Sequence, residues 1–146
     1  MHTLLKTTCE IPLQKENTLR FTEKVNPVLS SKCRRRLRYM HMQSFDWDQG
    51  GLLSPIKFID RDSVEYSLMA AADGKKNEEK MAKLTLDKAM ALIDPIWGGV
   101  YQYSTLSKWN APHCRKTMAT QAGHLRLYSL AYAHMKSNDY LNVTSS

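Results

Sequence analysis

The sequence has few of the features that place a protein in a membrane, a secretory route or a redox pathway. No run approaches the roughly eighteen apolar residues of a membrane-spanning helix, so we expect no transmembrane helix. The opening MHTLLKTTCEIPLQKEN lacks the basic start, apolar run and cleavage site of a secretory signal, and we expect a cytoplasmic protein. The three cysteines, Cys9, Cys33 and Cys114, form no C-x-x-C pair. The spacing favours reduced thiols over a redox centre or a zinc knuckle.

Metal-ligating and strand-forming patterns are also scarce. His124 and His134 are ten residues apart and therefore do not form an i, i+4 metal pair on a helix. We expect no metal and no cofactor. Because almost no segment shows the alternation of a half-buried strand, the predicted fold class is all-α, built from helical hairpins.

Positive charge is concentrated in the N-terminal third. Residues 1–44 hold nine of the 21 Lys and Arg but only three of the 14 acidic residues, a net charge of +6 out of +7. The charge peaks at Lys32–Arg38, which could bind an anionic surface or be a solvated segment. No aromatic platform or RNA-binding signature accompanies it, so nucleic acid is not a favoured partner. We divide the chain into a basic, partly irregular segment, 1–44, and a hairpin domain, 45–146.

The helix boundaries follow from capping residues and breakers. Ser30 or Ser31 can cap the first helix; Asp62, with Glu65 three residues later, forms a capping box for the second. Asn77 can cap the third, which the Asp94-Pro95 step ends. A segment after Ser137 is too short for a stable helix. The predicted helices are 31–44, 62–72, 77–93 and 112–136, with a further short piece at 18–25.

Two wide apolar faces are predicted. In the helix over 112–136 the face is wide enough to require neighbours on more than one side, and exposed parts of it favour self-association or a partner chain. The stripe of the helix over 77–93 consists of Met81, Ala82, Leu84, Leu86, Ala89 and Ile93. That of the helix over 112–136 consists of Met118, Ala122, Leu125, Tyr128, Tyr132 and Met135, and Leu127, Leu130 and Ala131 add apolar surface beyond it.

Two similar units precede helices. FDWDQGG and IDPIWGG each place an aspartate, Asp46 or Asp94, ahead of a Gly-Gly pair, and glycine permits turns that side chains exclude. Their repetition indicates a turn role for each aspartate, not a catalytic carboxylate pair, which would have to flank one bond. The glycines assigned to these turns are Gly50, Gly51, Gly98 and Gly99.

The segment 93–122 contains the strongest candidates for a site. Tyr101, Tyr103 and Trp109 could stack on a sugar ring or equally fill the interior of a hairpin. Pro112 suits the first turn of a helix, which would place His113 at a helix N-terminus as a neutral ring. His113 could then contact a sugar hydroxyl, act as a general acid or base, or serve only in capping and packing.

These residues carry a resemblance to a known family. FDWDQGG…KFIDRDSVEY and IDPIWGGVYQYST…WNAPH…QA…LRLYSLAYA resemble the helical domain of the thioredoxin-like proteins related to spermatogenesis-associated proteins. That domain is an (α/α)6 toroid of the six-hairpin glycosidase type, also found in sugar epimerases. The resemblance covers about residues 45–141 and implies a partial arc of such a toroid. By this resemblance the substrate-binding residues would be Tyr101, Tyr103, Trp109, His113 and Gln121.

The sequence departs from the family where an acid would be expected. The family continues its W-x-x-P-H motif with a glutamate, where this chain has Arg115, and a guanidinium cannot exchange protons near neutral pH. Four or five helices also cannot close a ring of twelve. Three hypotheses follow: a non-catalytic fragment of a six-hairpin domain, a sugar-binding or sugar-modifying domain that needs the missing hairpins, and a basic interaction module.

Overall fold

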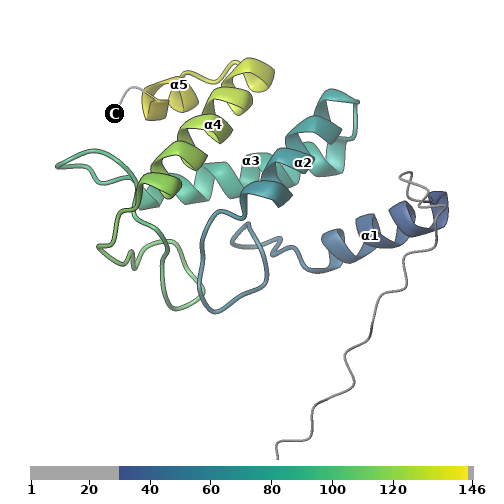
Figure 1. The fold of residues 1–146 in the computed structure, drawn as a ribbon, viewed down its shortest axis with the longest axis horizontal. Coiled ribbons are helices and arrows are strands. Elements are labelled where there is room, and N and C mark those ends of the chain that lie inside the picture. The colour runs from purple at the N-terminus through teal and green to yellow at the C-terminus, as the bar shows by residue number, and fades with distance from the viewer. Residues whose placement is uncertain (1–29, 145–146) are drawn as a thin grey trace, which may run out of the picture.

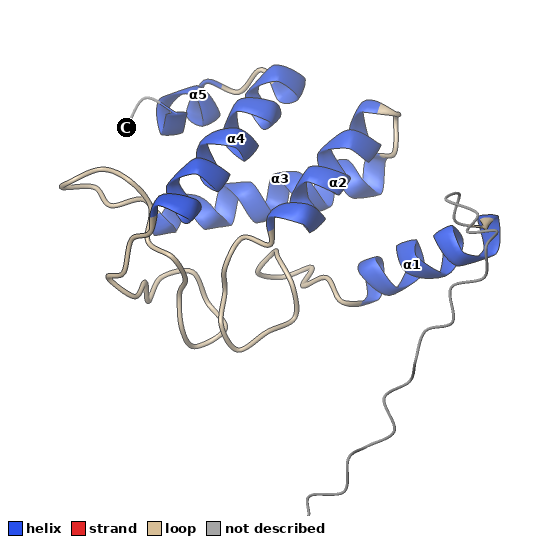
Figure 2. Ribbon diagram, viewed as in Figure 1, coloured by secondary structure: helices blue, strands red, loops and turns tan. Residues whose placement is uncertain are grey.

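The computed structural model describes residues 30–144, and this part of the chain is all-α, as predicted (Figure 1). It contains no strand, only isolated bridges between loops (Figure 2). No helix in this range has the length and apolarity needed to cross a bilayer. The short helix predicted at 18–25 lies outside the described residues. The helices are α1 (Ser31–Gln43), α2 (Arg61–Ala72), α3 (Lys76–Ala89), the 3-10 turn η1 (Met90–Leu92), α4 (Met118–Met135) and α5 (Asn138–Thr144).

The core lies where α2, α3 and α4 meet. Helices α2 and α3 form a hairpin, α4 packs on α2, and α5 folds back on α4 (Figure 1). Leu86, Leu127 and Tyr128 are completely buried at this junction, and the Tyr128 hydroxyl donates to the Leu86 carbonyl at 2.9 Å. The structure thus has helical hairpins, as predicted, but its described residues do not by themselves define a toroid.

The predicted helix starts are correct only for α1. Ser30 caps α1 by accepting a hydrogen bond from the Cys33 N–H at 3.2 Å. The capping box on Asp62 is wrong, because α2 begins one residue earlier, after Asp60. The cap on Asn77 is wrong as well, because α3 already includes Lys76. At both starts no side chain caps the helix, so capping chemistry did not locate the boundary.

The helix predicted from Pro112 begins six residues later. Pro112 lies in extended backbone that bridges to Ser104, and the His113 N–H donates to the Tyr103 carbonyl at 2.9 Å. The cap of α4 is Thr117, whose side chain accepts from the Thr120 N–H. Pairing with the preceding loop therefore overrides the preference of proline for a first helical turn, and neither Pro112 nor His113 lies at a helix N-terminus.

The apolar face predicted for α4 is correct in part. Its Leu127, Tyr128 and Ala131 are completely buried, whereas Met118 is 83% exposed and Leu125 is 52% exposed. The buried face also includes His124 and Gly123. Helix α5, predicted to be too short, exists because its Tyr140 is buried against Tyr128 and donates a hydrogen bond to Asp87. The stripe predicted for α3 agrees more closely with the structure, because its Met81, Ala82, Leu86 and Ala89 are all buried.

Helix α1 is attached through polar contacts and has no buried residue. Arg38 forms an ion pair with Glu78 at the start of α3. The His41 ring lies between the hydroxyls of Ser63 and Ser67 on α2, at 3.1 and 3.3 Å. A groove is left between α1 and the hairpin.

Candidate functional site

The two repeated units fold into two loops of the same design. In the first loop, one carboxylate oxygen of Asp46 accepts hydrogen bonds from the N–H groups of Asp48 and Gln49, at 3.0 and 2.9 Å. The Asp46 backbone N–H donates to the Gly51 carbonyl, and the Gly50 N–H donates back to the Asp46 carbonyl. Asp46 therefore holds a closed turn, in agreement with the predicted turn role.

The second loop repeats this pattern. One carboxylate oxygen of Asp94 accepts from the N–H groups of Ile96 and Trp97, at 2.9 and 3.2 Å. The Asp94 N–H donates to the Gly99 carbonyl, and the Gly98 N–H donates to the Asp94 carbonyl. The two aspartates thus occupy equivalent positions in separate turns.

A lysine closes each loop. The Lys57 ammonium lies 2.6 Å from the second carboxylate oxygen of Asp46 and also donates to the Gly50 and Leu52 carbonyls. Lys116 does the same in the second loop, at 2.6 Å from both Asp94 and the Gly98 carbonyl. The role of Lys116 was missed at the sequence level. The available signal was that each unit places a lysine shortly before the helix that follows its loop.

Both Gly-Gly pairs adopt the left-handed conformation. The φ angles are 74° and 70° at Gly50 and Gly51, and 68° and 73° at Gly98 and Gly99. Residues with a Cβ rarely adopt this region, so both turns depend on glycine.

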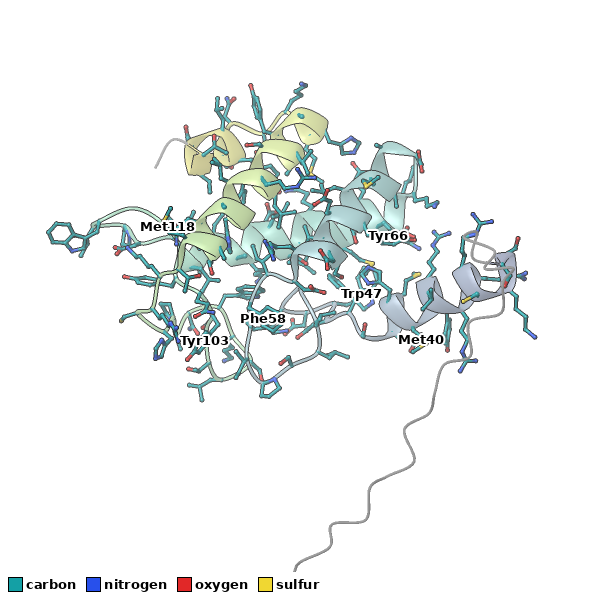
Figure 3. The ribbon with its side chains drawn as sticks, in the orientation of Figure 1. Met40, Trp47, Phe58, Tyr66, Tyr103 and Met118 are labelled. Atoms are coloured by element: carbon teal, nitrogen blue, oxygen red, sulfur yellow. The ribbon has the colours of Figure 1, made fainter. Side chains whose placement is uncertain are left out.

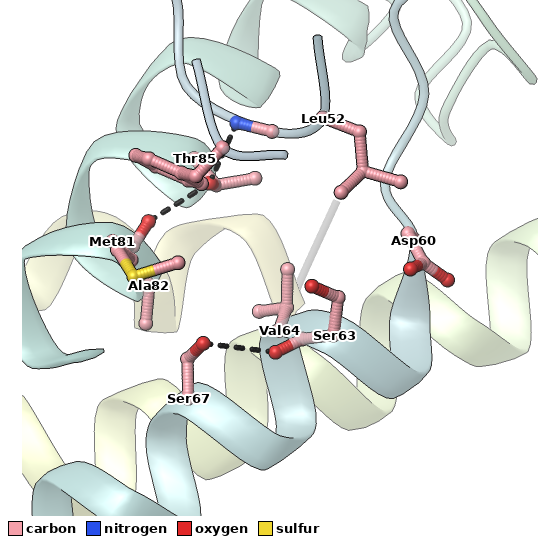
Figure 4. Close-up of a pocket in the computed structure, with 10 residues that line it drawn as sticks. Leu52, Asp60, Ser63, Val64, Ser67, Met81, Ala82 and Thr85 are labelled. Atoms are coloured by element: carbon pink, nitrogen blue, oxygen red, sulfur yellow. Dashed lines mark hydrogen bonds between the residues drawn. The ribbon is translucent and has the colours of Figure 1, made fainter. Parts of the chain in front are cut away.

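The first loop is covered by other parts of the chain. The Thr85 hydroxyl on α3 accepts from the Gly51 N–H at 2.9 Å and donates to the Met81 carbonyl at 2.8 Å (Figure 4). The cavity in this close-up, lined among others by Thr85 and Ser67, has a volume of only about 10 Å³, room for about one water. Gly50 and Lys57 of the first loop are therefore buried, whereas Trp47 is 51% exposed, and this cavity is too small for a ligand.

Trp109 also covers the first loop. It is 3% exposed, and its indole N–H donates to the Gln49 carbonyl at 2.7 Å. A side chain at Gly51 would meet its ring at 3.2 Å. Of the two roles left open for Trp109, the structure has the packing role, and the ring offers no free face to a ligand.

Tyr101 and Gln121 stabilise the second loop. The Lys116 ammonium lies 5.1 Å from the centre of the Tyr101 ring, a cation–π contact. The Gln121 side chain accepts from the Val100 N–H and donates to the Val100 carbonyl, both at 2.7 Å. These two predicted binding residues are therefore already engaged with the chain itself.

Tyr103 and His113 are the predicted site residues that the structure brings face to face. Their rings stack with centres 4.9 Å apart and planes inclined by 14°, at the surface (Figure 3 labels Tyr103). Arg115 is exposed, and its carbonyl accepts from the Gln102 N–H. The Arg115 side chain thus lies at the surface, next to the segment that carries the two tyrosines.

A cavity of about 380 Å³ adjoins Tyr103. In the described part of the chain its lining contains no carboxylate; it consists of Ile56, Phe58, Ile59, Arg61, Gln102, Tyr103, Thr117, Ala119, Thr120 and His124. Phe58 and Tyr103 lie near one another at the base of the loops in Figure 3.

His124 is a buried polar group of this cavity that sequence reasoning did not assign to a site. It is 4% exposed, its Nδ1 donates to the Thr120 carbonyl at 2.9 Å, and its Nε2 has no hydrogen-bond partner among residues 30–144. Burial lowers the pKa of His124, so the ring is neutral near pH 7. A buried lone pair without a donor is costly, and a hydroxyl group could satisfy it.

The loop carboxylates are unsuited to proton transfer near neutral pH. The hydrogen bond from Lys116, followed by that from the Ile96 N–H, holds the pKa of Asp94 well below its usual range. Burial raises the pKa of Asp46, but the Gln49 N–H and Lys57 outweigh it, so the pKa is also lowered. Both groups are therefore permanently ionised at neutral pH and have their oxygens occupied.

No metal centre forms in residues 30–144, where His, Cys, Asp and Glu side chains nowhere gather in threes. Comparison of the chain with protein-family models and with curated proteins found no match.

Proposed function

We propose that the chain is a non-catalytic helical-hairpin module of the six-hairpin glycosidase and epimerase type. The observation that carries this proposal is the use of Asp46 and Asp94 as turn anchors. Each has one oxygen on two backbone N–H groups and the other on a lysine. Glycoside hydrolysis requires one carboxyl group that carries a proton and a second that faces the same bond.

The cavity next to Tyr103 supports the same conclusion, because none of the side chains that line it is a carboxylate. His124 is its titratable group with a pKa near neutrality in free solution, and its Nδ1 is committed to the Thr120 carbonyl. One neutral imidazole provides an acceptor for a ligand hydroxyl but no acid–base pair.

The test is an assay for epimerase and glycosidase turnover on a panel of mono- and disaccharides. We expect no turnover from the wild type. We also expect no turnover from Arg115→Glu, which places the glutamate of the resembling family at an exposed position. Turnover by the wild type that is lost in Asp94→Asn would overturn the proposal. Circular dichroism of each variant verifies that the helices are retained.

A second candidate is binding of a neutral sugar without turnover, favoured by the unpartnered His124 Nε2 beside an aromatic ring. Saturation-transfer NMR with the same sugars measures it. Tyr103→Ala should abolish the transfer, whereas Tyr132→Ala, on the same domain but outside the cavity, should leave it unchanged. Absence of transfer from every sugar would eliminate this candidate and leave the non-catalytic module intact.

A further inference from the structure

We propose that the groove between α1 and the α2–α3 hairpin binds an acidic peptide segment that carries apolar side chains. The groove has a volume of about 670 Å³. Its lining combines cations with apolar and aromatic surface and, among the residues that the structure describes, includes no carboxylate: Arg34, Arg35, Leu37, Arg38, His41, Ser63, Tyr66 and Lys75.

Charge complementarity identifies the sign of the partner. Arg34 and Arg35 come from α1, and Lys75 comes from the turn before α3, so positive charge lines both sides of the groove. Glu78, a buried carboxylate near the groove, is paired with Arg38 and also attracts Lys75. Arg34 and Arg35 take part in none of the ion pairs within residues 30–144, so at least these two cations are left to meet acidic side chains of a partner.

The apolar part of the groove identifies the kind of partner. Leu37 is 50% exposed and Tyr66 is 40% exposed, and both face the groove as lining residues. The Tyr66 ring is held edge-on by His41, with ring centres 5.4 Å apart. A phosphate backbone gains little from a leucine, whereas an amphipathic peptide buries apolar side chains in such a groove between flanking charges.

The binding test uses the whole chain and a fluorescein-labelled synthetic peptide with Glu and Leu at helical spacing. A peptide of the same charge without leucine and a single-stranded oligothymidine serve as the other probes. Fluorescence polarisation should show the Glu–Leu peptide bound more tightly than both. Tighter binding of the oligothymidine, or no binding of the peptide, would overturn the proposal.

Helix α1 provides a matched charge control. Arg34→Glu with Arg35→Glu removes two groove cations, whereas Lys32→Glu with Arg36→Glu makes the same change in net charge outside the groove lining. We expect the double substitution of Arg34 and Arg35 to weaken peptide binding by about tenfold or more. The double substitution of Lys32 and Arg36 should weaken it by only about two- to threefold, through the loss of long-range attraction. An equal loss in both pairs would show that net charge alone attracts the peptide and would overturn the groove assignment.

The contribution of Tyr66, the tyrosine that lines the groove, is tested by a second pair of variants. Tyr66→Ala should weaken binding of the Glu–Leu peptide, whereas Tyr39→Ala, which changes an exposed tyrosine of α1 outside the groove, should not. The leucine-free peptide should be insensitive to both substitutions. If Tyr39→Ala weakens binding as much as Tyr66→Ala, the apolar contact does not lie in this groove.

Discussion

The first and second Asp–Gly–Gly–Lys loops share their main hydrogen bonds but differ in how far their lysines are buried. In the first, the lysine is 1% exposed, and Trp109 and α3 cover the turn. In the second, the Lys116 side chain is 31% exposed, and Ile96 and Trp97 extend into solvent, at 80% and 87% exposure. The same local design therefore has a buried lysine in one place and a partly exposed lysine in the other, although the carboxylate is the more buried of the two in the second loop, with Asp94 5% and Asp46 15% exposed. The energetic weight of each lysine contact should differ accordingly.

The largest difference is expected at the two lysines. Lys57→Met should destabilise the fold by about 3 kcal/mol, because it leaves a partly buried carboxylate and two carbonyls without their cation. Lys116→Met should cost clearly less, because water can replace the exposed ammonium. Urea denaturation measures both free energies of unfolding. Lys83→Met, at an exposed i, i+4 pair, is the control and should change stability by less than about 0.5 kcal/mol. Equal losses at positions 57 and 116 would contradict the comparison.

The glycines should give the next largest difference. A Cβ at Gly50 would meet the backbone of α3, with Thr85 Cα at 3.0 Å and the Leu84 carbonyl carbon at 3.1 Å, which cannot move independently. A Cβ at Gly99 would meet the Gln121 side-chain oxygen at 2.9 Å, and this side chain can move aside only by giving up its two hydrogen bonds to Val100. Both substitutions add the strain of a left-handed residue, about 1 kcal/mol. Gly50→Ala should cost more than Gly99→Ala, because the backbone of α3 cannot move aside, whereas displacing Gln121 costs about 1 kcal/mol for each hydrogen bond lost. Thermal and urea unfolding of the two variants would show the order; a reversed order would contradict the packing of the first loop on α3.

The tryptophans form a third pair. Trp109→Phe should cost about 1 kcal/mol or more, since the Gln49 carbonyl loses its hydrogen-bond donor in the interior. Trp97→Phe should leave stability unchanged, because the ring is in solvent. Fluorescence spectra test the same assignment: removal of Trp109 should delete the blue-shifted component of the emission. A blue-shifted component that persists in Trp109→Phe would show that the buried indole is a different one.

The smallest effects should appear in the response to acid. Both loop aspartates have a pKa that is lower in the folded state than the value of about 3.9 in the unfolded chain. Such groups contribute stability that is complete above the unfolded pKa and is lost as the pH falls toward the folded pKa. Asp94→Asn should flatten the decline of stability below about pH 4 more than Asp46→Asn, because the pKa of Asp94 is lowered further. Unfolding midpoints across this pH range measure the slopes.

Local patterns predicted the elements better than their ends. The four long helices were predicted, because the spacing of apolar residues and the residues that end a helix are encoded within each segment. For α1 the capping residue was predicted as well. The start of α4 was wrong because Pro112 pairs with Ser104, a contact that periodicity does not contain. The burial of Trp109 and His124 depends in the same way on partners far along the chain. Tyr103 and His113 were both predicted as site residues, but their stacking against one another required the folded loop.

The amino-acid sequence alone determined that this protein is helical, that most of its net positive charge lies before residue 45, and that two Asp and Gly-Gly turns precede helices. These properties depend on backbone preferences and on residues only a few positions apart. Only the tertiary structure decided which turn is buried, which lysine closes each turn, and which aromatic rings are left for a ligand. Those outcomes depend on contacts such as Trp109 to Gln49 and Lys116 to Asp94, between segments that only folding brings together.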